Sequence, residues 1–418
     1  MSSELPESDA SAGPCAAVGV GSAVGTRSRD TSVMATSMRE MVTDAQPPAP
    51  DLTHLLSVVA GSVDEIERSR RLPDGVVSAL RESGIHRLAV PRELGGIESS
   101  VCDSMDVFER LAAVNGSTAW CAVIGAGSNL FAGYLPEHVA RVVFADPDQG
   151  NATMFAPAGR IVVNGGEHVL SGRWPFTSNC LHSEWVGLGA FVEGLDATPR
   201  VAFVPVEALD VEDTWDSAGL RGTGSHHVNA TNVPVGLERC CTFADRPWPA
   251  GTMWRLPIYS ILLPTLAAVP LGIARGALDE VGRQVRDGRT ARRGQLADDP
   301  IALAEFARTD ARLRAARAVL REAIGEAQCQ ASEAKPVDRV LQARILVACL
   351  HACETAVAAT SAAHQLGGGA AAYTGSRLLR ALGDVQAARQ HLLFSHKHLP
   401  ELAKPLAGLD TPYPPFIL

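Results

Sequence analysis

The chain has 418 residues, of which 46% are hydrophobic and 20% charged, so it can bury a large core and is not a disordered polymer. Its formal net charge of -9 excludes the basic surface that attracts nucleic acids or anionic membranes. The nine cysteines contain no Cys-x-x-Cys pair, which favours reduced thiols in a cytoplasmic protein.

The first fifty residues predict a disordered extension. Residues 1–50 are rich in Ser, Ala, Gly and Pro and have no lasting hydrophobic period. The acidic Glu4, Glu7 and Asp9 argue against a secretory signal peptide, which starts with positive charge. Met34 is an alternative to Met1 as the biological start.

Residues 51–148 read as a helical domain. The segment 74–84 predicts a short helix that stops at a glycine. Asn115 offers a cap before an apolar helix over 119–130. Trp120 falls in the first turn of that helix, where its type and position favour a core anchor.

Residues 149–246 read as a small β domain. Apolar runs such as 161–163 and 201–206 are separated by glycine and proline turns, as in strands. Two further strands are predicted over 162–171 and 185–192.

Between those two strands, residues 172–180 read Gly-Arg-Trp-Pro-Phe-Thr-Ser-Asn-Cys and predict a tight turn. Large flat side chains beside short hydroxyl side chains suit a planar heteroaromatic ligand, which needs stacking on its face and polar contacts at its edge. A hydrophobic hairpin with its aromatic residues in the core is the alternative.

From Trp254 onward helices return, with helical spacing over 302–328 and 340–365. The uncharged segment 256–274 is long enough for a transmembrane helix. We expect no membrane span, because three prolines interrupt the segment, namely Pro257, Pro264 and Pro270.

No metal site is predicted. In a helix, His351 would point away from the face that Cys349 and Cys353 share. The pairs His226-His227 and His396-x-His398 have no further ligands at useful spacing.

Three motifs together resemble those of the acyl-CoA dehydrogenase superfamily. They are the Trp-Pro-Phe-x-Ser turn at 174–178, the Gly-Leu-Arg-Gly-Thr-Gly-Ser run at 219–225, and the C-terminal pair formed by 365–369 and 384–391. The chain looks most similar to the oxygenase components of two-component flavin monooxygenases, over roughly residues 51 to 405.

The resemblance implies an α+β fold that is mainly α. It predicts an N-terminal helical domain over 51–148, a middle β-barrel domain over 149–246, and a C-terminal four-helix bundle over 247–405. A tail over 406–418 follows, and the segment 256–274 would enter the bundle. Members of this family assemble as tetramers, so a homotetramer is expected.

The implied function is the oxygenase component of a two-component flavin-dependent monooxygenase. Reduced FMN or FAD would come from a separate NAD(P)H-flavin reductase, since the chain shows no nicotinamide-binding βαβ unit. With O2 it would form a C4a-(hydro)peroxyflavin that oxygenates a small aromatic or polycyclic substrate. One alternative is an acyl-CoA dehydrogenase-type oxidoreductase with Glu280 or Glu354 as base, and another is an inactive assembly or binding subunit.

His391 is the candidate acid or base. Dehydrogenases of the family end the corresponding segment in Tyr-Glu-Gly, whereas here it reads Gln390-His391-Leu392. His391 follows Asp384 by seven residues, two helical turns on the same face. Its imidazole, neutral or cationic, can hydrogen-bond to bound oxygen species or deprotonate a phenol. The family's Arg-x-x-Arg-Asp appears as Arg380-x-x-Gly383-Asp384, so its second arginine is missing.

The resemblance also implies the flavin contacts. Ser178 would approach flavin N5, and Trp174 and Phe176 would wall the isoalloxazine ring. The remaining expected contacts are Thr177 in the same turn, Trp120, the loop residues Gln365 and Gly368 that reach a neighbouring subunit's flavin, and Arg289 and Arg292 near its phosphate end.

Overall fold

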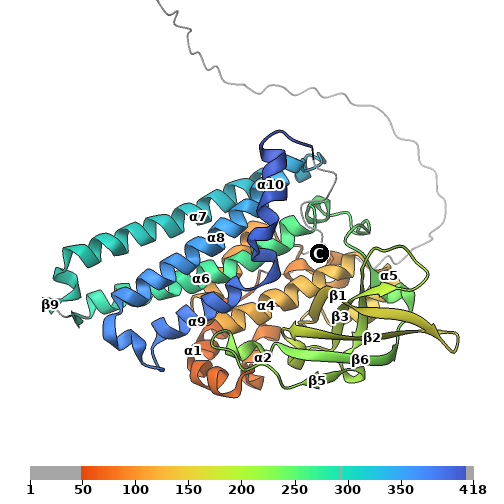
Figure 1. Cartoon of the computed structure of the whole chain (residues 1–418), viewed down its shortest axis with the longest axis horizontal. Helices are drawn as coiled ribbons and strands as arrows, with labels where there is room; N and C mark the ends of the chain where they lie inside the picture. The colour runs from red at the N-terminus through yellow and green to blue at the C-terminus, as the bar shows by residue number, and fades with distance from the viewer. Residues whose placement is uncertain (1–48, 292–293, 411–418) are drawn as a thin grey trace, which may run out of the picture. The chain divides into compact units, whose positions relative to one another are not determined.

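The computed structural model describes residues 49–291 and 294–410 (Figure 1). The predicted disordered extension therefore lies almost wholly outside the described residues, as do Met34, Arg292 and the last eight residues of the tail. The described residues belong to one compact unit.

Among the described residues, five α-helices precede the sheet. They are α1 (Leu52–Ser69), α2 (Asp74–Glu82), α3 (Val101–Ala112), α4 (Gly116–Asn129) and α5 (Glu137–Val143). The Asn115 side chain caps α4 by accepting a hydrogen bond from the backbone N–H of Thr118 at 2.8 Å. Gly84, with φ of 72°, lies directly after α2, where a left-handed residue ends a helix at least cost.

A seven-stranded sheet follows in the order β5-β6-β2-β1-β3-β4-β7. Its strands are β1 (Ala152–Asn164), β2 (Glu167–Thr177), β3 (Trp185–Val192), β4 (Arg200–Pro205), β5 (Asp210–Glu212), β6 (His226–Pro234) and β7 (Cys240–Cys241). Only β1 and β3 pair in parallel among these neighbours, and apolar side chains of the central strands form the sheet's own core.

Two details of the sheet differ from the sequence prediction. The strand expected over 162–171 is two strands, because Gly165 and Gly166 both have positive φ, 62° and 90°, and form a two-residue hairpin turn. The turn expected over 172–180 begins later, since β2 continues to Thr177 by pairing with β6. The chain turns only at Asn179, where φ is 66°.

Four long helices form the C-terminal bundle (Figure 1). They are α6 (Tyr259–Arg286), α7 (Pro300–Ser332), α8 (Arg339–Leu366) and α9 (Arg377–Arg389), with the short hairpin β8 (Thr290–Ala291) and β9 (Gly294–Gln295) between α6 and α7, and α10 (Leu399–Leu406) at the end. Helix α6 packs against α3, α8 and α9. Its Gly272 and Gly276 allow this approach, because a Cβ at either would lie 2.3 Å from a backbone oxygen of α3 or of the residue that follows it.

The prolines predicted to interrupt the segment 256–274 do not break it. Pro264 and Pro270 both lie inside α6, whose residues around them are buried in the bundle. Helices α6 and α8 are long and apolar enough to cross a membrane by length and composition alone. In the structure 89% of the most apolar window of α6 is buried, so its hydrophobicity is accounted for by packing within the protein.

Candidate functional site

Trp120 connects two of the predicted catalytic residues. It lies in α4, is 5% exposed, and its indole Nε1–H donates a hydrogen bond to Ser178 Oγ at 3.1 Å. On its other side the indole meets the ring of His391 edge-on, with 5.6 Å between ring centroids. Residues from three distant segments, in α4, just after β2 and just after α9, therefore meet around one indole ring.

Ser178 begins a directed chain of hydroxyl groups. Its Oγ lies 2.7 Å from Ser225 Oγ, which lies 2.7 Å from Thr223 Oγ1. Thr223 donates its single hydroxyl proton to the carbonyl oxygen of Leu220 at 2.8 Å. Ser225 must then donate to Thr223, and Ser178 to Ser225, because each hydroxyl has only one proton. Ser178 Oγ thus accepts the hydrogen bond from Trp120 Nε1–H and keeps one lone pair for a ligand that donates.

The loop over 219–225 is held in place by both helical regions. The Leu220 N–H donates to a carboxylate oxygen of Asp384 in α9 at 2.6 Å. The Gly222 N–H donates to Ser117 Oγ in α4 at 3.1 Å. A Cβ at Gly219 would lie 2.0 Å from the carbonyl oxygen of Gly383, so the loop and α9 touch backbone to backbone.

The same contact accounts for the missing second arginine. Gly383 occupies the place of that arginine, and a Cβ there would lie 2.5 Å from the carbonyl oxygen of Ala218. The remaining Arg380 pairs across to α1, with Asp64 at 3.4 Å and Glu67 at 3.8 Å.

His391 differs from its prediction in one respect. Helix α9 ends at Arg389, so His391 is not a helical residue two turns beyond Asp384 on one face. It caps the 3-10 turn Leu392–Phe394, where its Nδ1 accepts the N–H of Leu393 at 3.3 Å. A neutral ring with Nδ1 as acceptor carries its proton on Nε2. Desolvation lowers the pKa of His391 to about 4, so this neutral tautomer prevails at pH 7.

The two aromatic residues of the predicted turn have different environments. Phe176 is 59% exposed, with φ of 62°, and its ring lies edge-on to Trp215 and His227 at 6.3 and 5.6 Å. An outward aromatic ring held in a strained backbone conformation fits a ligand-facing role.

Trp174, expected to wall a flavin, is instead fully buried in the core of the sheet. Its exposure is 0%, and its Nε1–H donates to the carbonyl oxygen of Gly189 at 2.8 Å. Thr177 is buried as well, and its hydroxyl donates to the carbonyl oxygen of Trp174. The bulge between Trp174 and Thr177 explains this, since it turns Phe176 outward while Trp174 and Thr177 face the core.

A second group of predicted residues gathers at the α8–α9 connection. The Arg289 guanidinium donates to the carbonyl oxygen of Gly367 and to the side chain of Gln284. Gln365 and Gly368 are exposed beside it, and Gly368 has φ of 57°. No hydrogen bond or ring contact among the described residues joins this group to Trp120, Ser178 or His391.

The carboxylates proposed for a dehydrogenase are engaged elsewhere. Glu280 in α6 is hydrogen-bonded to Arg283 and Gln284, and Glu354 in α8 pairs with His396. Within the described part of the chain, no carboxylate is hydrogen-bonded to Ser178 or His391. The described residues also contain no group of three or more His, Cys, Asp or Glu side chains placed to hold a metal ion.

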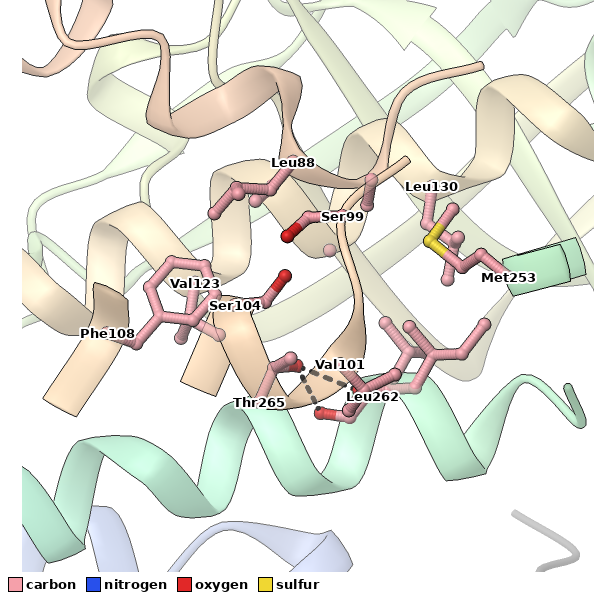
Figure 2. A pocket seen from close by; sticks show the side chains of 14 residues that line it. Leu88, Ser99, Val101, Ser104, Phe108, Val123, Leu130, Met253, Leu262 and Thr265 are labelled. Carbon is pink, nitrogen blue, oxygen red and sulfur yellow. Dashed lines mark hydrogen bonds between the residues drawn. The ribbon is translucent and has the colours of Figure 1, made fainter. Parts of the chain in front are cut away.

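A cavity lies between α3, α4 and the start of α6 (Figure 2). Its lining includes Val123 and Ala126, which stand one to two turns after Trp120 in α4. The polar groups of the lining are the hydroxyls of Ser99, Ser104 and Thr265, and no charged side chain lines it. Thr265 already donates within α6, as the dashed lines of Figure 2 show.

Comparison with known proteins identifies the family. Residues 56–138 match the acyl-CoA dehydrogenase N-terminal domain, and residues 264–396 match its C-terminal domain. The chain is 32% identical to indole-3-acetate monooxygenase of Pseudomonas putida over 332 residues, which cover 78% of this chain and 85% of that protein. It belongs to the acyl-CoA dehydrogenase family.

Further relatives place it among the flavin-dependent oxygenases of this family. The oxygenase subunit HsaA of Rhodococcus jostii is 29% identical, over 81% of this chain and 92% of its own length. XiaF from Streptomyces, solved with FADH2 and glycerol, superposes with a TM-score of 0.81 at 27% identity, over 87% of this chain and 95% of its own. The prediction of an oxygenase component that uses reduced flavin is confirmed.

The residues present fit a flavin. Phe176 offers an exposed aromatic face, and Ser178 beside it offers a buried oxygen with a free lone pair. Sequence analysis missed Ser225 and Thr223, which complete the hydroxyl chain. Their signal was in the Gly-Thr-Gly-Ser run, to which no individual role was assigned.

We expect Ser178→Ala to fold and to bind reduced flavin. Free hydrogen peroxide formed per reduced flavin should rise about fivefold, since one hydrogen bond is worth roughly 1 kcal/mol net. Ser171→Ala, which removes a hydroxyl from the strand that leads to Ser178, is the matched control. Equal peroxide yields from wild type and Ser178→Ala would remove Ser178 from the site.

Proposed function

We propose that the protein oxygenates a small neutral aromatic compound with reduced flavin delivered by a separate reductase. The observation that carries this proposal is the meeting of Ser178, Trp120 and His391 around one buried indole. When bound, reduced flavin supplies the electrons that activate O2. The protein residues hold, orient and dry the reacting groups.

Ser178 has a specific part in this proposal. Its Oγ donates to Ser225 and accepts from Trp120, which leaves it able to accept one further hydrogen bond. The N5 position of a reduced flavin carries a proton, so Ser178 Oγ could accept a hydrogen bond from N5–H and slow the loss of that proton. His391, with its proton on Nε2, acts as a neutral donor toward an oxygen atom.

The cavity beside α4 has a volume of about 20 Å³, room for about one water molecule, so it would have to widen to admit an aromatic substrate. Its lining of apolar side chains and three hydroxyls has no cation to pair with a carboxylate. The chemistry of this lining therefore favours an uncharged ring system, even though one relative is named for indole-3-acetate. Homotetrameric assembly and a cytoplasmic location remain part of the proposal. A tetramer would allow Gln365, Gly368 and Arg289 to serve the flavin of a neighbouring subunit.

We expect Ala126→Phe to fill this cavity. Ala126 is 3% exposed and lines this cavity, so a phenyl ring there overfills it and blocks the widening that a substrate ring would require. With indole as probe, the KM should rise by about tenfold or more, as loss of one apolar subsite costs roughly 1–3 kcal/mol. Affinity for reduced FAD should stay within about twofold. An unchanged KM would place the substrate elsewhere.

The dehydrogenase alternative has a direct test. We expect anaerobic addition of butyryl-CoA or octanoyl-CoA to leave the absorbance of protein-bound oxidised FAD unchanged, because Glu280 and Glu354, the two candidate bases, are both engaged with other side chains. Bleaching of the flavin band would establish the dehydrogenase and overturn the proposed oxygenation.

A further inference from the structure

The side chain of Asp384 lies between the segments that carry Trp120, Ser225 and His391. It is 3% exposed in α9, and one of its oxygens accepts the Leu220 N–H at 2.6 Å. A Cβ at Gly116 would lie 2.9 Å from its other oxygen, so the carboxyl group also touches the first residue of α4. One side chain thus contacts the helix of Trp120, the loop of Ser225 and the helix that leads to His391.

Leu220 is the residue through which Asp384 acts. It is a buried leucine with φ of 53°, a left-handed conformation that is strained for a residue with a side chain. Its carbonyl oxygen accepts hydrogen bonds from Thr223 Oγ1 at 2.8 Å and from Trp215 Nε1 at 3.0 Å. The hydroxyl chain that starts at Ser178 therefore ends on the residue that Asp384 holds.

We propose that Asp384 is a positioning residue, which holds Leu220 in its left-handed conformation and so fixes the direction and spacing of the Thr223–Ser225–Ser178 hydroxyl chain. The inference rests on the proposed function for its consequence in catalysis. The acceptor oxygen performs this role, and the negative charge is not required. Asp384→Asn keeps the acceptor oxygen but loses the charge, whereas Asp384→Ala loses both, so comparing the two variants tests the oxygen separately from the charge.

The test uses the full chain without flavin. Amide hydrogen exchange of residues 218–226 should become about tenfold or more faster in Asp384→Ala, because loss of the acceptor frees the loop. In Asp384→Asn the same segment should exchange within about twofold of wild type. Asp338→Ala is the matched control, since Asp338 caps α8 by accepting the Leu341 N–H at 2.8 Å and is remote in sequence from the loop. It should leave exchange in residues 218–226 unchanged.

Two results would overturn the proposal. One is a folded Asp384→Ala protein whose loop exchanges like wild type. The other is a folded Asp384→Asn protein whose loop exchanges much faster than wild type, and this result decides the matter even if the alanine variant does not fold. Because no flavin is present, failure here is separate from failure of the oxygenase function, which wild-type turnover reports.

With reduced FAD and O2, the same variants report the effect on the site. Asp384→Ala should release several times more hydrogen peroxide per reduced flavin than Asp384→Asn does. Equal peroxide yields from two folded variants would mean that the hydroxyl chain is not positioned through Asp384, whatever the loop does.

Asp384 also predicts a pH dependence of stability. Burial raises the pKa of Asp384 from 3.8 to about 7. The hydrogen bond from the Leu220 N–H lowers this pKa, the negative charge of Glu67 in α1 raises it, and the positive charge of Arg380 in α9 lowers it. Between about pH 4 and 7 the folded protein keeps a proton that the unfolded chain has released, so this group's contribution to stability falls as pH rises. The Tm of Asp384→Asn minus the Tm of wild type should therefore increase between pH 5 and pH 8. A constant difference in Tm would show that Asp384 does not titrate in this range.

Discussion

His391→Ala should lower the rate of substrate oxygenation by about 10²-fold, the usual contribution of a positioned proton donor or acceptor. The imidazole lies against Trp120, and its Nδ1 is occupied by the Leu393 N–H, so only Nε2–H is free to act. Affinity for reduced flavin should change by no more than about threefold, because the aromatic face of Phe176 and the Ser178 oxygen remain.

The measurement is oxygenated product formed per reduced flavin consumed, with wild type and variant side by side. His138→Ala is the matched control, since His138 is an exposed histidine on α5. Because the pKa of His391 is lowered to about 4, the wild-type rate should show no limb near pH 6.5 that depends on this residue. Equal product yields from wild type and His391→Ala would return His391 to a purely structural role.

Gly219→Ala should be strongly disruptive for so small a substitution. The added Cβ would lie 2.0 Å from the carbonyl oxygen of Gly383 and 2.1 Å from its carbon, and both are backbone atoms of α9 that have no rotamer to change. We expect a loss of at least about 3 kcal/mol in the free energy of unfolding, at the upper end for overpacking. Residual folded protein should have its Leu220–Asp384 hydrogen bond broken and oxygenation strongly reduced.

Gly61→Ala provides the control for this substitution. Gly61 lies in α1 with no atom within 4 Å of its would-be Cβ. Alanine there should raise stability by about 0.5–1 kcal/mol, through helix propensity alone. Urea unfolding of both variants checks the pair, and a Gly219→Ala protein as stable as wild type would mean that the loop does not touch α9.

Local chemistry explains which parts of the fold could be predicted. The Asn115 cap and the stop at Gly84 depend on hydrogen bonds and dihedral angles within a few residues, and both were correct. The prolines of α6 were misjudged because burial among neighbouring helices outweighs their local cost. The end of α9 before His391 was missed because a helical period alone does not mark its last residue.

The site was predictable only in part. Ser178, Phe176, Trp120 and His391 could be proposed from motifs, but a bulge that turns Phe176 outward and Trp174 inward leaves no mark in the sequence. The hydrogen bond from the Leu220 N–H to the Asp384 side chain joins residues 164 positions apart, a contact that a single sequence does not reveal.

The most direct test of the account is a single turnover under ¹⁸O2 with chemically reduced FAD and no reductase. The probes are indole, resorcinol and dibenzothiophene, three aromatic compounds without a carboxylate. We predict that at least one yields a product carrying one ¹⁸O atom, in wild type and in His138→Ala, and that this product is lost in His391→Ala. Formation of one hydrogen peroxide for each reduced flavin oxidised with every probe, and no ¹⁸O in any of the probes, would contradict the proposal.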